Sequence, residues 1–376
     1  MVTIKPGSHA HQLLQLLAVA GEIPASALSI LGNERVLSVL VHKLESVQDI
    51  RFDKSGQIYH AKLIQVNGKR SERSIRLYKK GIPVLDGLYP GLVEWYMATF
   101  NKNNFSGDQF HVWRNHRVAE ALAVCLAAGI DIRAYALPAL QKIGINLVVP
   151  DSPSFYIARS LKKTESDNLN KTMYTRIVGA LFYPGGVYAT YNTRDAVMKW
   201  SGRGEVKTVG NLLELARMNA GLSEVNAAVL FGRNAEVALK TILESDKSRR
   251  PEMRFDRIYS SIYFIPLNQN GVRLLRILIS PDWNERLLSA LFEPEERSYN
   301  KGSMEYDAIK DGRKILSHLD GDIARLIRFR EALVSYPEPA LVLCYPWQTG
   351  FLKTYLGELA EILELQMDEV ESALVI

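Results

Sequence analysis

The chain has 376 residues, a formal net charge of +5 and 47% hydrophobic residues. This length allows two or three domains with their own cores, and the sequence contains neither an internal repeat nor a low-complexity tract. No apolar run approaches a membrane span, and the N-terminus lacks a signal-peptide core, so a cytoplasmic protein without a membrane partner is expected. Cys125 and Cys344 both lie in apolar runs and are expected to be buried thiols of a reducing compartment.

The N-terminal segment predicts three short helices. Apolar spacing over 9–20 predicts the first helix, with Ser8 as its N-cap and Gly21 at its end. The second helix is expected at 24–31, with Pro24 in its first turn. Asn33 is expected to cap the third helix, at 34–47.

The third helix has two chemically different faces. Its predicted apolar face consists of Val36, Leu37, Leu40, Val41 and Leu44. The opposite face carries Arg35, Ser38, His42 and Lys43. In helix-turn-helix proteins the second helix of the motif presents such polar residues to base edges in the major groove.

A strand pair with a basic tip follows these helices. The stretch 57–66 predicts one strand, Asn67-Gly68 is a hairpin-turn signal, and 74–78 predicts the returning strand. The segment from Arg35 to Lys80 holds eleven Lys or Arg against four Asp or Glu, a net charge of +7. Helices followed by a basic hairpin predict a winged helix-turn-helix domain that binds double-stranded DNA. The predicted DNA-binding residues are Arg35, Ser38, His42, Lys43, Lys69, Arg70, Arg73 and Arg76.

The polar stretch 102–107 marks the expected end of this module. We therefore expect a DNA-binding domain at 1–105 and a helical connector at 106–145, which contains a helix over 111–128. An α/β domain is expected to occupy 146–376.

Strands and helices alternate through this third region. Hairpins are predicted at 177–193 and between 259–267 and 272–279, and the apolar run 340–345 predicts a central strand. The expected helices are 206–218, 234–244, 282–291, 321–334 and 352–365. This pattern predicts an α/β (α+β) fold class with a mixed sheet.

One set of residues suggests catalysis. Asp195 followed by Glu205 and Lys207 is similar to the acidic residues and Glu-x-Lys step of restriction-endonuclease-like nucleases, in which carboxylates hold Mg²⁺. Asp151 is a further acidic candidate. That chemistry requires Glu205 and Lys207 on one strand face, yet a helix is expected to begin at Glu205, which favours a structural carboxylate. Apart from Mg²⁺ in a nuclease, we expect no cofactor and no metal site.

Tyr188, Tyr191, Trp200 and Arg194 form a second group, because aromatic side chains beside arginine can stack on single-stranded nucleic acid. The favoured interpretation is that these aromatic residues alternate through the core of a sheet.

Several segments resemble the replication-relaxation family, winged-helix proteins of plasmids and conjugative mobile elements. These segments are KLESV, RSIRLYKKGIPVL, NHRVAEALAVCLAAGIDI and GGVYATYNTRDAVMKWSGRGEVKT. The resemblance implies a DNA-binding accessory role in replication, transfer or regulation, with replication or relaxase proteins as partners. It also implies that the C-terminal domain could have a nuclease-like fold.

The sequence thus favours a non-enzymatic DNA-binding protein, whose α/β domain would serve dimerisation or partner docking. Two alternatives stay open at this point: a Mg²⁺-dependent nuclease that uses the α/β domain, and a scaffold whose winged helix binds protein.

Overall fold

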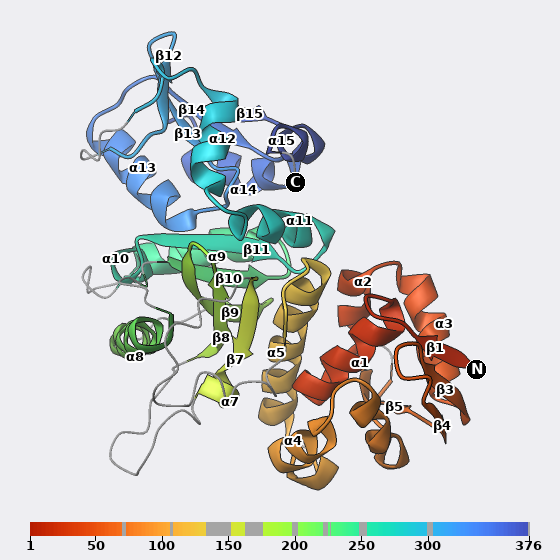
Figure 1. The fold of residues 1–376 in the computed structure, drawn as a ribbon. Coiled ribbons are helices and arrows are strands. Elements are labelled where there is room, and N and C mark those ends of the chain that lie inside the picture. Colours follow the sequence, from red (N-terminus) through yellow and green to blue (C-terminus); the bar gives the residue numbers. More distant parts are fainter. Residues whose placement is uncertain are drawn as a thin grey trace. The chain divides into compact units, whose positions relative to one another are not determined.

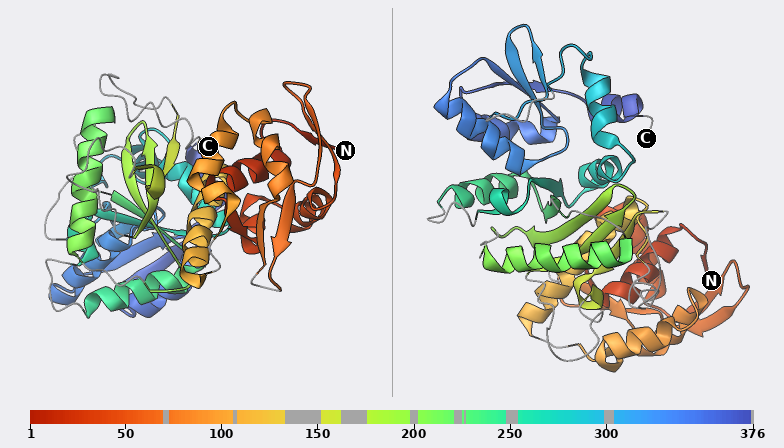
Figure 2. Two further views of the ribbon diagram at one scale, coloured as in Figure 1. Left: turned by 90° about the horizontal axis from the view of Figure 1, so that it is seen from below. Right: turned by 60° about the vertical axis from the view of Figure 1, so that its left-hand side comes forward.

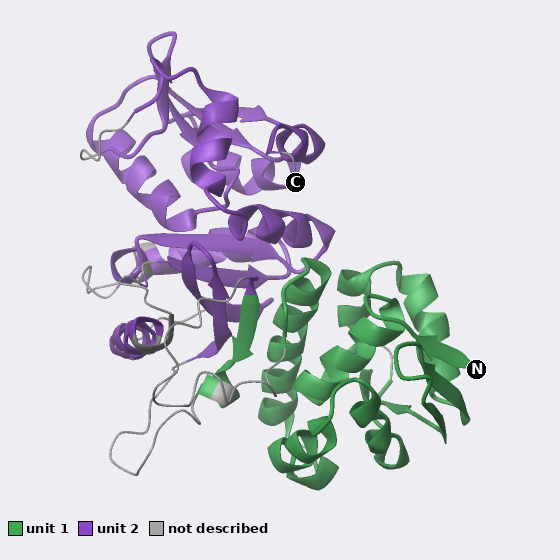
Figure 3. Ribbon diagram, in the orientation of Figure 1, with its two compact units in different colours: residues 1–145, 154–164 green, residues 146–153, 165–376 purple. Residues whose placement is uncertain are grey.

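The computed structural model describes residues 1–69, 73–105, 108–132, 152–161, 176–197, 202–220, 225, 227–247, 254–298 and 304–374. The chain divides into two compact units, shown in Figure 3: unit 1 comprises residues 1–145 and 154–164, and unit 2 comprises residues 146–153 and 165–376. Arg70, Asp151 and Trp200 lie outside the described residues.

Unit 1 begins with strand β1 (Val2–Ile4) and helix α1 (His9–Ala20). The Ser8 side chain accepts a hydrogen bond from the His11 backbone N–H, as the N-cap prediction required. Gly21 ends the helix with φ +75°, a conformation that costs glycine little. The buried leucines of α1 place its apolar face in the core of unit 1.

The predicted second helix is mostly replaced by other structure. Residues 22–24 form strand β2 (Glu22–Pro24), followed by a 3₁₀ turn (Ala25–Ala27) and the short helix α2 (Leu28–Leu31). Strand β2 pairs with a strand far along the chain, Ile23 lying opposite Ile75. Long-range pairing of this kind overrides local helix signals.

Helix α3 (Glu34–Leu44) is capped by the Asn33 side chain, which accepts hydrogen bonds from Arg35 N–H and Val36 N–H. The helix ends three residues before the predicted boundary. Leu37, Val41 and Leu44 are buried as expected. Val36 was predicted on the apolar face, but its side chain is exposed.

Two small sheets complete the first part of unit 1. Strands β3 (Gln48–Phe52) and β4 (Ile58–Ala61) join β1 in the order β1-β3-β4, while β5 (Ile64–Asn67) and β6 (Ser74–Leu77) join β2 in the order β2-β6-β5. The single strand predicted at 57–66 is therefore wrong, because the chain changes sheets around the buried Leu63. The predicted pairing of the two strands is confirmed, because Asn67 lies opposite Ser74. Asn67 itself ends β5, and of the Asn-Gly pair only Gly68 has a positive φ, +79°.

The remainder of unit 1 is mainly helical. Its elements are the 3₁₀ segment Lys79–Gly87, α4 (Leu92–Thr99), the 3₁₀ turn Asn101–Asn103, α5 (Gln109–Ala127), β7 (Ser154–Ile157) and α7 (Ala158–Leu161). Helix α5 packs against α1, α2 and β2. The segment expected to act as a connector thus contributes a core helix to unit 1.

The first sheet of unit 2 begins with the predicted hairpin. Strands β8 (Ile177–Tyr183) and β9 (Gly186–Arg194) are antiparallel. Strand β10 (Ala227–Gly232) is parallel to β9, and β11 (Ser261–Pro266) is parallel to β10. The helices of this part are α8 (Arg203–Ala220), α9 (Ala235–Asp246) and α10 (Phe255–Ile258).

The second predicted hairpin of this region is wrong. Residues after β11 form helix α11 (Gln269–Leu278), whose Val272, Leu275 and Ile277 are buried. The Asn268 side chain accepts a hydrogen bond from Gly271 N–H and caps the helix. Gly271 is needed because the Pro266 carbonyl leaves no room for a Cβ atom. The Asn-Gly pair therefore starts a helix instead of a hairpin turn.

The second sheet of unit 2 has the order β12-β13-β14-β15. Its elements, with the surrounding helices, are α12 (Trp283–Leu291), β12 (Ala308–Lys310), β13 (Arg313–Ser317), α13 (Ile323–Ser335), β14 (Ala340–Cys344), α14 (Pro346–Leu356), β15 (Glu361–Glu364) and α15 (Met367–Leu374). The buried strand β14 lies between two parallel neighbours, which confirms the predicted central strand. The helix predicted at 352–365 is wrong, since Gly357 ends α14 and β15 follows.

The fold is mixed α/β, with several sheets rather than the one mixed sheet expected for the C-terminal region (Figure 1). In unit 2 the two sheets share no strand; the right-hand view of Figure 2 shows them apart, and α13 packs against β11. None of the helices in the described part of the chain is long and apolar enough to cross a membrane.

Candidate nucleic-acid interface

Helix α3 presents a broad exposed face in unit 1. The exposed side chains on this face are Arg35, Val36, Ser38, Val39, His42 and Lys43. The buried Leu37, Val41 and Leu44 fix the opposite face against the core. All four residues of α3 that the sequence predicted to contact DNA are therefore accessible to a partner.

The strand pair β5–β6 with its loop, called the basic hairpin below, is attached to the end of α3. Val66 N–H donates a hydrogen bond to Glu45 Oε1 at 3.3 Å, and Leu63 N–H donates one to the Leu44 carbonyl at 3.0 Å. Lys69 and Arg73, in the loop of this hairpin, are exposed. These bonds keep the base of the hairpin beside the C-terminal end of α3.

Arg76 on β6 has a different environment. Its Nη2 donates a 2.8 Å hydrogen bond to Glu22 Oε1, and the Glu22 side chain is only 1% exposed. Its guanidinium also lies over the Phe105 ring. Burial alone would raise the pKa of Glu22, but His116, Ser74 and Arg76 hold it at about 2. Arg76 thus joins β6 to β2, and we leave it out of the candidate interface.

The candidate catalytic residues are not assembled into one site. Asp195, after β9, is exposed and pairs with Arg233 at 2.7 Å. Glu205 lies in the first turn of α8 with 0% side-chain exposure, 3.9 Å from Arg176. Lys207 is exposed on the same helix. Because both Glu205 and Lys207 are helical, the buried carboxylate and the exposed ammonium point in different directions.

The aromatic group in the first sheet of unit 2 belongs to its core. Tyr188 donates a hydrogen bond to the Leu278 carbonyl at 2.9 Å, and the hydroxyls of Tyr191 and Tyr259 are 2.7 Å apart. Tyr188 and Tyr191 are both buried. Their side chains are therefore not available to stack on a nucleic-acid base.

Two cavities of unit 2 lie away from the catalytic candidates. One, of about 170 Å³, is apolar and lies between α12 and α15, with Leu287 and Val370 in its wall. The other, of about 310 Å³, is lined partly by Arg257, Lys314 and Glu331. Neither is lined by Asp195, Glu205 or Lys207.

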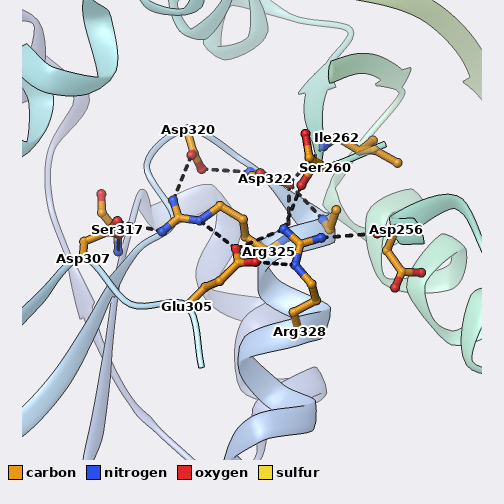
Figure 4. A network of polar contacts seen from close by, with 11 residues as sticks. Asp256, Ser260, Ile262, Glu305, Asp307, Ser317, Asp320, Asp322, Arg325 and Arg328 are labelled. Carbon is orange, nitrogen blue, oxygen red and sulfur yellow. Dashed lines mark hydrogen bonds and ion pairs between the residues drawn. The ribbon is translucent and has the colours of Figure 1, made fainter. Parts of the chain in front are cut away.

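A buried ionic network in unit 2, shown in Figure 4, was not predicted from the sequence. Arg325 on α13 donates a hydrogen bond to Asp307 Oδ1 at 2.7 Å and lies 3.6 Å from Asp320 Oδ2. Arg328, one turn later, donates to Glu305 at 2.7 Å and to the Ser260 carbonyl at 2.7 Å. The network therefore links α13 to residues before β12 and to the segment that leads into β11.

The loop after β13 also joins α13 to β11, through hydrogen bonds from backbone N–H groups of β11. Asp322 Oδ1 accepts a hydrogen bond from Ile262 N–H at 3.0 Å and also caps α13 through Ala324 N–H. Phe264 N–H donates to the Gly321 carbonyl at 2.9 Å. This loop therefore pairs with β11 and stabilises the packing of α13 against it.

Burial raises the pKa of Asp320 in this loop to about 7, and the charges of Asp322 and Asp307 add to the rise while Arg325 opposes it. A carboxyl whose pKa is raised in the folded state stabilises the fold most below its unfolded pKa, and this contribution disappears as the pH rises through the folded value. We expect the free energy of unfolding of unit 2 to fall as the pH rises from about 4 to 7, by on the order of 1 kcal/mol per pH unit at most.

The Asp320→Asn variant should lose this pH dependence, because its amide keeps the hydrogen bond from Asp322 N–H without ionising. Chemical denaturation at intervals from pH 4 to 8 measures the difference. Asp311→Asn, at an exposed turn residue, is the matched control and should behave like the wild type. An equal pH dependence in wild type and Asp320→Asn would contradict the prediction.

Within the described residues, no three His, Cys, Asp or Glu side chains are grouped so that they could hold a metal ion. Comparisons with family models, with curated protein sequences and with solved structures found no match to this chain. The resemblance to the replication-relaxation family thus stays a prediction. Two surfaces of unit 1 bear on function, the exposed face of α3 and the basic hairpin.

Proposed function

We propose that unit 1 is a winged helix-turn-helix domain that binds double-stranded DNA through α3 and the basic hairpin. The observation that carries the proposal is the attachment of the hairpin to the end of α3 by Glu45 and Leu44. A single duplex could then contact the polar face of α3 and the exposed cations Lys69 and Arg73 together.

The order of elements supports this proposal. Helix α1, strand β2, helices α2 and α3, and then the hairpin β5–β6 follow one another, and the strands pair in the order β2-β6-β5. A helix-turn-helix places its second helix in the major groove, and here that helix is α3. The pair β3–β4 is inserted between α3 and the hairpin and pairs with β1 in a separate sheet, so it does not interrupt the β2-β6-β5 arrangement.

Electrostatics favour a polyanionic partner over a protein of mixed charge. The segment 35–80 carries a net charge of +7. A duplex presents two phosphates per base pair, and cations that neutralise them release counterions, which drives binding at low salt. We therefore assign phosphate contacts to Lys69 and Arg73 and include Arg70, from the same loop, on its sequence position alone.

Base recognition is assigned to α3. Arg35, Ser38, His42 and Lys43 are exposed on the face that would enter the major groove. Arginine and lysine can bind guanine O6 and N7, and serine can hydrogen-bond to several bases. Together with the resemblance to plasmid and mobile-element proteins, this supports a non-enzymatic accessory role in replication, transfer or regulation.

The experiment that tests base recognition is selection of bound duplexes from a random pool, followed by affinity measurement on the enriched duplex. We expect Arg35→Ala and Lys43→Ala each to relax the preference for the enriched duplex over random DNA by about 5–150-fold, which corresponds to about 1–3 kcal/mol for a lost base contact. Binding to random DNA should change much less.

Arg233→Ala provides a matched control, because Arg233 is an exposed arginine of unit 2 that pairs with Asp195. Its selected sequences should equal those of the wild type. If Arg35→Ala and Lys43→Ala instead weaken binding to enriched and random DNA equally, these residues contact phosphates and do not read bases.

A further inference from the structure

The centre of the exposed face of α3 is apolar. At about 100° per residue, Val39 lies in the middle of this face, with Arg35 and His42 on one side and Lys43 and Val36 on the other. Val39 is 56% exposed and Val36 is 52% exposed. The side chain at the centre of the face that would meet a groove is therefore a valine flanked by polar and cationic groups.

Valine at these two exposed positions is not what the stability of α3 favours. A β-branched side chain loses rotamer freedom in a helix, and an exposed one buries little apolar area in return. The core-facing side of the helix is already formed by Leu37, Val41 and Leu44. A role in contacting a partner explains why positions 36 and 39 hold apolar residues.

The cations beside Val39 indicate what that partner is. Arg35 and Lys43 flank the valine at exposed positions, and this charge complements a phosphate-lined groove. Among the four bases, only thymine presents an apolar group on its major-groove edge, the C5-methyl group. An apolar side chain in the middle of a cationic helix face thus matches a thymine-bearing site.

We infer that Val39, assisted by Val36, recognises thymine C5-methyl groups in the major groove, so that the preferred duplex carries thymine at the position facing the centre of α3. This inference rests on the proposed DNA-binding function and specifies the base that the helix prefers. Arg35 and Lys43 would contact the flanking base pairs or phosphates.

The test uses the duplex enriched from a random pool and versions of it in which single thymines are replaced by uracil, which removes only the methyl group. For wild-type protein, one or two such replacements should weaken binding about four-fold each, the value of one buried methyl group. Val39→Ala should weaken binding to the thymine duplex by a similar factor and should no longer distinguish thymine from uracil at the position that faces Val39. This non-additivity identifies a direct contact.

Val206→Ala is the matched control, because Val206 is 51% exposed on α8 of unit 2. It should keep the wild-type preference for thymine over uracil. Equal binding of thymine and uracil duplexes by the wild type would overturn the inference while leaving duplex binding intact. A Val39→Ala variant that loses self-association in sedimentation, but binds both duplexes like the wild type, would also overturn it. If the wild type retains no duplex at all, both the inference and the proposed function fail.

Discussion

Replacing Arg325 with methionine is expected to destabilise unit 2 by about 3–5 kcal/mol, the usual cost of removing one partner of a buried ion pair. Asp307 and Asp320, both buried, would lose the guanidinium that lies 2.7 Å and 3.6 Å from their carboxylates. Methionine fills a similar volume, so the loss reports the uncompensated charges more than a cavity. Hydrogen exchange of the β13 and α13 amides, measured across a denaturant series, detects it locally.

Two further variants test whether the loss of stability in Arg325→Met comes from the buried ionic network. Arg313→Met removes an arginine that pairs with the exposed Glu361 and should cost at most about 1 kcal/mol. Adding Asp307→Asn and Asp320→Asn to Arg325→Met should restore part of the lost stability, because the buried charges are then removed together. If Arg325→Met and Arg313→Met cost the same, the buried network is not what stabilises this part of unit 2.

Neutralising the basic hairpin is expected to have the largest effect on DNA binding. The variant Lys69→Gln/Arg70→Gln/Arg73→Gln removes up to three phosphate contacts, each of which contributes about 0.9 to the slope of log affinity against log salt. The slope should therefore decrease by about 2.7, and affinity at physiological salt should fall on the order of a hundred-fold for all duplex sequences. Fluorescence anisotropy with a labelled random duplex measures both quantities.

The control variant must carry the same change in net charge at another place. Arg203, Lys207 and Lys353 are exposed residues of unit 2, and their replacement with glutamine gives that control. Its salt slope should equal that of the wild type. If both triple variants lower the slope by the same amount, binding follows the net charge of the chain and the hairpin has no special role.

The parts of the fold that could be predicted from the sequence are those fixed by local chemistry. Ser8 and Asn33 cap α1 and α3 through hydrogen bonds from nearby backbone N–H groups, and the Asn67-Gly68 signal marks the end of β5, before the chain returns as β6. The uniformly apolar run of β14 indicated a central strand. In each case the determining residues lie within a few positions of the structure that they specify.

The parts that could not be predicted depend on residues far apart in the chain. Strand β2 exists because it pairs with β6, and a Pro24 signal for a helix start could not reveal that partner. Residues 268–271 are an exception: Asn268 caps α11 through Gly271 N–H, only three positions away, and the same Asn and Gly residues also favour the hairpin turn that the sequence predicted.

The candidate site shows the same division. The exposed polar residues of α3 followed from its helical period, whereas the exposure of Val36 and the buried pairing of Arg76 with Glu22 did not. Arg76 belongs to a basic stretch in the sequence, and its buried acidic partner lies 54 residues earlier in the chain. The Arg325 network likewise gathers residues from separate loops, so no sequence motif indicated it.

The central claim is that α3 and the basic hairpin of unit 1 bind duplex DNA. The most direct test is the affinity of the full-length chain for a random duplex across a salt series, compared with the hairpin triple variant in the same buffers. We predict measurable binding at low salt, a linear decrease of log affinity with log salt, and a smaller slope for the variant. Absence of binding at low salt, or an unchanged slope in the variant, would contradict the claim.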